Sequence, residues 1–258
     1  MRLMKRILSA AAVLALSASL LVGCSSGTAS SVPVSASSAA ESTVSSVEET
    51  ASSAVDENEA AAAQLLNDLT GSYQELWPVI LADEYKQTWL DDCTALVGEE
   101  NAEAAFEKLS SMVTSDVYGE DAVEAYANGG GAYFCGFTNS LATLTFDGET
   151  STISGTDKDG NVLFSHAYHY IGMGPVRGLY EFESDDADSG EFTYFFLAPD
   201  TSVETYHIEF RYGSDAEALS QYDAGEYAYW LASGISTDCD QTMIDNCIEL
   251  FCTENLAG

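Results

Sequence analysis

The stretch that decides the fold is residues 141–170, which read LATLTFDGETSTISGTDKDGNVLFSHAYHY. Apolar and polar residues alternate in it in three short runs, as they do in half-buried β-strands. The runs are residues 141–146, 151–155 and 162–170. Asp147-Gly148 and Asp159-Gly160 separate them, and such pairs are typical of tight hairpin turns. The stretch therefore predicts antiparallel strands that are joined by short turns.

Short strands and helices continue on both sides of this stretch. Further alternating runs cover residues 133–137, 178–183, 192–197 and 206–212. Helical patterns cover residues 55–70, 83–97, 100–112 and 241–256. Many short strands with brief turns favour an antiparallel barrel or sandwich. We therefore expect a mainly β fold with flanking helices (α+β).

The composition limits the partners of the chain. Its 258 residues include 8 Lys and Arg against 42 Asp and Glu, so the formal net charge is −34. Such a surface repels phosphate backbones, which excludes nucleic-acid binding by a basic face, and it concentrates cations. Hydrophobic residues make up 46 % of the chain, which is enough to build a core.

The N-terminus has the pattern of a lipoprotein signal. Arg2, Lys5 and Arg6 precede an apolar run over residues 7–22, which is short for a membrane span. The run ends in Leu21-Val22-Gly23-Cys24, which resembles the bacterial lipobox. The pattern predicts a lipid on Cys24, and it places the protein at the cell membrane, anchored on the extracytoplasmic face. An ordinary secretory peptide with a chance cysteine is the alternative.

The remainder divides into a linker and one domain. Residues 1–23 are the expected signal peptide, and residues 24–57 form a Ser/Ala-rich linker without an aromatic residue. Residues 58–258 are the expected folded domain, with a helical insertion at about residues 83–132.

One histidine lies in a pattern that is typical of a metal-binding site. On a strand, Thr205, His207 and Glu209 share one face, and Asp200 starts the same segment. One imidazole with carboxylates is an ordinary site for zinc or a similar divalent ion. A lone histidine beside solvated acids is the alternative. The chain has no nucleophile elbow, phosphate-binding loop or His-Glu-x-x-His motif, so we do not expect an enzyme.

The sequence does not determine which cysteines form disulfide bonds. Five follow Cys24, an odd number that cannot pair completely within one chain. They are Cys93, Cys135, Cys239, Cys247 and Cys252. Cys135 and Cys247 have the pattern of buried thiols, and a bridge that involves Cys239 stays open.

The order of several motifs resembles the ZinT (YodA-like) family of extracytoplasmic zinc- and cadmium-binding domains. The opening of the domain matches at Leu66, Asp68, Gly71, Tyr73-Gln74 and Trp77-Pro78. The strand motifs match at Tyr180-Glu181-Phe182-Glu183, at Tyr194 with Asp200, and at Thr205-Tyr206-His207-Ile208. A looser match is the cluster Tyr227, Tyr229 and Trp230. The resemblance covers roughly residues 60–250.

The resemblance implies a calycin-like (lipocalin-related) antiparallel barrel that binds Zn²⁺ through three histidines near its mouth. Only the last of them is retained, as His207, while Asp200 and Thr205 stand at the other two positions. Glu204 or Glu209 would then complete the site. The implied role is to bind a divalent transition metal and to assist its uptake, with a metal-uptake transporter as partner.

A metal-free barrel is the alternative function. Aromatic residues of the barrel would then hold a small organic ligand, or the domain would act as a surface interaction module. These residues are Tyr168, Tyr170, Tyr194, Phe196 and Tyr206. Plain core packing is the competing interpretation of the same residues.

Overall fold

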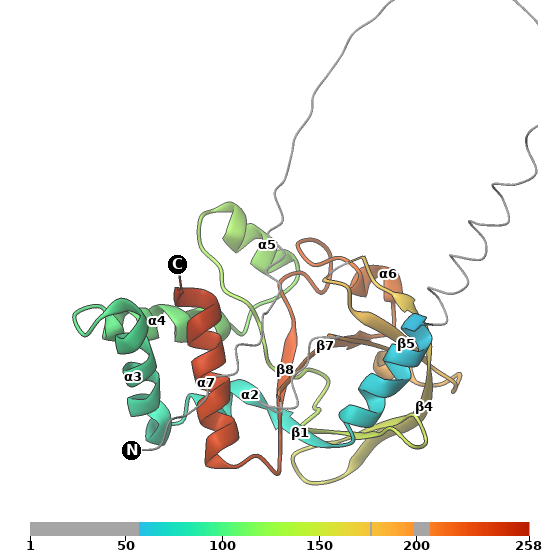
Figure 1. The fold of residues 1–258 in the computed structure, drawn as a ribbon. Helices are drawn as coiled ribbons and strands as arrows, with labels where there is room; N and C mark the ends of the chain where they lie inside the picture. The colour runs from blue at the N-terminus through green and yellow to red at the C-terminus, as the bar shows by residue number, and fades with distance from the viewer. Residues whose placement is uncertain (1–56, 176, 199–206, 258) are drawn as a thin grey trace, which may run out of the picture. The chain divides into compact units, whose positions relative to one another are not determined.

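Eight antiparallel strands close into a barrel in the computed structural model, which describes residues 57–175, 177–198 and 207–257. Each strand pairs with the next along the chain, and β8 pairs with β1 to close the barrel (Figure 1). The strands are β1 (Gly71–Glu75), β2 (Thr143–Asp147), β3 (Thr152–Thr156), β4 (Val162–Met173), β5 (Tyr180–Ser184), β6 (Tyr194–Leu197), β7 (His207–Gly213) and β8 (Ala232–Ser236). The expected calycin-like barrel is confirmed as a closed up-and-down barrel of eight strands.

The hairpin of β2 and β3 illustrates how the sequence builds this barrel. Phe146 pairs with Ile153, and both side chains are buried while their neighbours are partly exposed. The turn needs glycine at position 148, because a Cβ there would lie 2.4 Å from the Cα of Asn67. Asp147 Oδ1 accepts a hydrogen bond from the backbone N–H of Glu149 at 3.1 Å. The predicted turn is therefore held both by its own side chain and by a close backbone contact.

Aromatic side chains fill the interior of the barrel. Phe195, Phe210 and Tyr212 are fully buried, and the ring centroids of Phe195 and Tyr212 lie 5.4 Å apart. The hydroxyl of Tyr212 donates a hydrogen bond to the carbonyl oxygen of Thr138 at 2.9 Å. Tyr168 is 3 % exposed in the same core, and Phe196 is 1 % exposed on the outer face of β6, where it belongs to the same apolar cluster. These two residues therefore pack the core, which was the competing interpretation of the aromatic set.

Helices form two layers around the barrel. The helix over residues 57–68 packs Ala62, Leu65 and Leu66 into the barrel core. A second core joins α2, α3, α4 and α7 to the outer face of β8 through Ile235. In it Trp89 is fully buried and donates its indole N–H to the carbonyl oxygen of Ile80 at 2.7 Å. Figure 1 shows this helical group beside the barrel. The helical elements are α2 (Leu76–Ile80), η1 (Asp83–Tyr85), α3 (Lys86–Val97), α4 (Ala102–Val113), α5 (Glu120–Ala127), η2 (Gly190–Phe192), α6 (Ala216–Leu219) and α7 (Gln241–Leu256).

One predicted strand is absent, and two strands were missed. Residues 133–137 form isolated bridges at Phe134 and no regular strand. The backbone of this segment instead bonds a loop, because Phe134 N–H donates to Tyr229 O and Leu231 N–H donates to Phe134 O. The missed strands, β1 and β8, are short and contain glycine and serine, which are weak strand formers.

The N-terminal predictions lie outside the described residues. The signal peptide, Cys24 and nearly all of the linker precede residue 57. Among the described residues, no helix combines the length and the apolar character that crossing a membrane requires. Within residues 83–132, the predicted helical insertion, the structure has η1, α3, α4 and α5.

Candidate functional site

Strand β7 carries an imidazole and a carboxylate on its outer face. Ile208 and Phe210 are 1 % and 0 % exposed and belong to the barrel core. His207 and Glu209 alternate with them, so they project to the opposite side of the strand. Ile235 of β8 pairs with His207 and lies on this outer face, in the core that the helices form. The two-residue period of the strand therefore places both polar side chains toward the helical layer.

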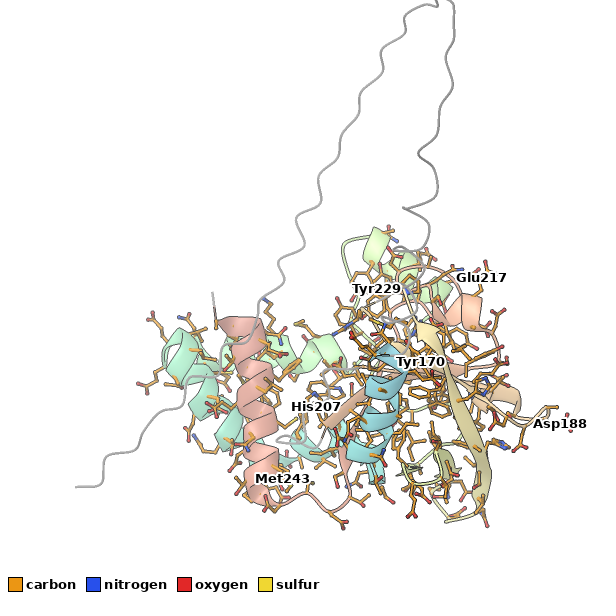
Figure 2. All side chains as sticks on the ribbon, turned by 45° about the vertical axis from the view of Figure 1, so that its right-hand side comes forward. Tyr170, Asp188, His207, Glu217, Tyr229 and Met243 are labelled. Atoms are coloured by element: carbon orange, nitrogen blue, oxygen red, sulfur yellow. The ribbon has the colours of Figure 1, made fainter. Side chains whose placement is uncertain are left out.

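Helices α2 and α7 cover this face and leave a small pocket over it. The pocket measures about 30 Å³, which is close to the volume that one water molecule occupies in the liquid. Its lining is Leu76, Trp77, Ile80, His207, Glu209, Cys247, Leu250, Phe251 and Glu254. Figure 2 shows His207 between the barrel and α7. A space of this size suits a single ion or water molecule rather than an organic ligand.

A larger cavity borders the same carboxylates. It measures about 270 Å³ and shares Trp77, Glu209, Phe251 and Glu254 with the small pocket. The rest of its lining is Met112, Val113, Tyr133, Cys135, Arg177, Tyr222, Leu231, Ser233 and Asn255. Glu209 and Glu254 therefore stand at the border of both spaces.

The charge of the site comes from its carboxylates and one guanidinium. Arg177 Nη2 donates to Glu209 Oε2 at 3.2 Å, and the Glu209 side chain is 29 % exposed. Burial, with a smaller contribution from Glu209, raises the pKa of Cys135 to about 12. Burial, with Cys239 and Glu209 adding to it, also raises the pKa of Cys247 to about 12. Both thiols are therefore protonated at neutral pH when no metal ion is bound.

The structure brings together only part of the predicted site. His207 and Glu209 line one pocket, as their shared strand face predicted. Asp200 and Glu204 lie outside the described residues. Within the part of the chain that the structure describes, no group of three or more His, Cys, Asp or Glu side chains is arranged to hold a metal ion. Of the four predicted ligands, the described residues include His207 and Glu209.

The other two histidines have carboxylate partners on the surface. His166 Nδ1 lies 2.7 Å from Asp186 Oδ2, and His169 Nδ1 lies 2.7 Å from Asp185 Oδ1. The histidines stand three apart on β4, so each bonds its own aspartate and they do not share one ion. Neither lines the pocket beside β7.

Sequence reasoning missed the contribution of α7. Cys247, Phe251 and Glu254 repeat at helical spacing, and the helix itself was predicted. The pattern of α7 indicates which residues share a face, but it carries no information on which strand that face covers. Arg177 was missed for a similar reason, because it meets Glu209 from 32 positions away.

The comparisons with known proteins found structural likeness only. No protein-family model matches the chain, and no curated protein matches it. The Zn(II)-bound ZinT-like domain of Streptococcus pneumoniae AdcA is similar with 16 % identity and a TM-score of 0.46, over 71 % of this chain and 89 % of that domain. Zn(II)-bound AdcA from the same species is similar with 14 % identity and a TM-score of 0.43, over 72 % of this chain and 35 % of that protein. The first of these carries the family name that the order of motifs indicated.

Proposed function

We propose that this chain binds a divalent transition metal ion, zinc or a similar ion, through His207. The observation that carries the proposal is the position of His207 and Glu209, which project from one face of β7 into one ion-sized pocket. Imidazole nitrogen and carboxylate oxygen are the ligands that such ions take in proteins. Glu254 on α7 lines the same pocket and adds negative charge there.

The rest of the ligand set comes, in this proposal, from the residues just before β7. Asp200 and Glu204 precede His207 by seven and three positions and offer further carboxylate oxygens. Asp200 is the second protein ligand in this proposal, Glu204 or Glu209 is the third, and water completes the shell. Binding a dication at Glu209 competes with the ion pair to Arg177, which is partly exposed and therefore weak.

The proposed cellular role is to hold the metal ion outside the cytoplasm and to pass it to an uptake transporter. The lipobox at Cys24 supports an anchor on the membrane, and the Ser/Ala-rich residues 24–57 support a tether that spaces the barrel from it. The net charge of −34 raises the local concentration of cations around the domain.

Calorimetric titration of the full chain with zinc tests the metal site. We expect one site per chain, and we expect His207→Ala to weaken it by at least about 10-fold, the loss that even an outer-shell change causes. Affinity also falls as the pH is lowered, because protons compete with the metal ion for imidazole and carboxylate ligands.

His169→Ala is the matched control, because His169 is exposed and does not line the pocket. This variant should keep the affinity and the stoichiometry of the parent chain. Equal zinc binding by the parent and by His207→Ala would remove His207 from the site and with it the proposal.

A further inference from the structure

Two buried cysteines from distant parts of the chain meet in the helical core. Cys93 lies on α3 and Cys252 on α7, and both are 0 % exposed. Their sulfur atoms are 3.9 Å apart, although the residues are 159 positions apart in the sequence. The two helices pack directly on each other in the core that covers the outer face of β8. The contact therefore joins the helical insertion to the C-terminus of the domain.

This pair has the geometry from which a disulfide forms with a small adjustment. A disulfide bond measures about 2.05 Å, so the sulfur atoms, now 3.9 Å apart, need to approach by about 1.9 Å. Cys135 is placed differently, because it lies against Ser233 and Trp77 on the barrel side of the structure. Cys247, five positions before Cys252 on α7, lines the pocket beside β7. Among the described cysteines, the sulfur–sulfur contact at 3.9 Å joins Cys93 to Cys252, while Cys239 interacts electrostatically with Cys247.

We propose that Cys93 and Cys252 form a disulfide that fixes α7 against α3. The reaction is thiol–disulfide exchange with an organic disulfide such as oxidised glutathione. One cysteine thiolate attacks the oxidant and releases one thiol, and the second cysteine then displaces the other thiol. Both cysteines lose their protons and together lose two electrons, and the oxidant is reduced to two thiols as its own sulfur–sulfur bond breaks.

The bond forms while the chain folds. In the folded domain, burial raises the pKa of both thiols, and the thiolate is the species that reacts. Zero exposure also keeps an oxidant away from both sulfur atoms. Exchange before α3 and α7 pack together avoids both barriers, and packing then shields the finished bond from reductants.

The proposed disulfide would also restrain one wall of the pocket beside β7. Phe251 and Glu254 flank Cys252 on α7 and line both the small pocket and the larger cavity. A covalent link at Cys252 therefore holds the helix that walls these spaces. The disulfide lies within the helical core, and its formation does not depend on whether a metal ion binds at His207.

Peptide mapping of the full chain tests the proposal without any substitution. The chain is refolded with reduced and oxidised glutathione, its free thiols are alkylated in denaturant without reductant, and it is then digested. We expect a linked peptide pair that contains Cys93 and Cys252, and we expect Cys135 and Cys247 to be alkylated. Alkylation of both Cys93 and Cys252 in natively refolded chain, or a link from either to another cysteine, would overturn the proposal.

Thermal unfolding gives a second readout. Reduction should lower the Tm of the refolded chain by about 10 °C, because the bond closes a very long loop. Cys93→Ser should abolish both the linked peptide and this shift, while Cys247→Ser, the matched control on the same helix, should keep both. A Tm that reduction leaves unchanged in the refolded parent chain would also count against the bond.

Discussion

A buried arginine organises the loop between β7 and β8, and its removal has a calculable cost. Arg211 is 0 % exposed and lies on the outer side of β7, where it pairs in register with Phe196. Its guanidinium donates to three backbone carbonyl oxygens of that loop, those of Leu219, Gln221 and Tyr227. Burial lowers the pKa of Arg211 to about 10, so it stays charged at neutral pH.

The cost of Arg211→Met follows from these contacts. Methionine fills much of the same volume but leaves three carbonyl groups without their charged donor. Gln221 is exposed, so water replaces the donor there, while Leu219 and Tyr227 are buried. Each of the two buried carbonyl groups costs about 1–3 kcal/mol when it is left unsatisfied. Relief from burying a guanidinium offsets part of this cost. We expect a net loss of about 3 kcal/mol in the free energy of unfolding.

Urea unfolding, followed by circular dichroism, measures this loss. The corresponding decrease in Tm is about 6–12 °C for a domain of this size. Arg177→Met is the matched control, because the side chain of Arg177 is 48 % exposed and its ion pair with Glu209 is worth less than about 1 kcal/mol. The loss should therefore be specific to the buried arginine.

An unchanged or higher stability of Arg211→Met would refute the reasoning. Replacing a buried ion with an apolar side chain is stabilising when the free energy of burying the ion exceeds the free energy that its interactions contribute. That outcome would mean that the loop carbonyls find water or new donors. A loss as large in Arg177→Met would equally show that burial is not what distinguishes Arg211.

Two further predictions concern stability. Burial and the nearby Glu249 and Asp245 raise the pKa of Asp92, so the folded chain gains stability as the pH falls through that raised value. Asp92→Asn should remove this dependence and raise the stability at neutral pH. Urea unfolding of both chains at pH 7 and at lower pH checks this, and a difference in stability that stays constant with pH would contradict it. Gly148→Ala should lower the free energy of unfolding by about 2 kcal/mol or more, because the new Cβ would meet the backbone of Asn67. Gly160→Ala is the control: its Cβ has open space, so the loss should be about 1 kcal/mol, which comes from the positive φ of this residue. Equal losses of the two variants in thermal unfolding would contradict the steric argument.

Local signals predicted the elements in which neighbours along the chain decide the conformation. Alternation and Asp-Gly turns predicted β2, β3 and the start of β4, and helical spacing predicted α7 from Gln241 to Leu256. Residues 133–137 have the same alternation, yet they bond a loop at Tyr229 and Leu231. Strand pairing depends on partners from elsewhere in the chain, so the same local pattern led to a correct prediction in one place and a wrong one in another.

The sequence by itself determined the strand period that puts His207 and Glu209 on one face, and it determined the acidic surface around them. The tertiary structure alone decided that α7 covers this face, that Glu254 and Cys247 join the pocket, and that Cys93 meets Cys252. The physical reason is range: periodicity acts between residues two to four positions apart, whereas closing the barrel and docking α7 depend on contacts between residues more than a hundred positions apart.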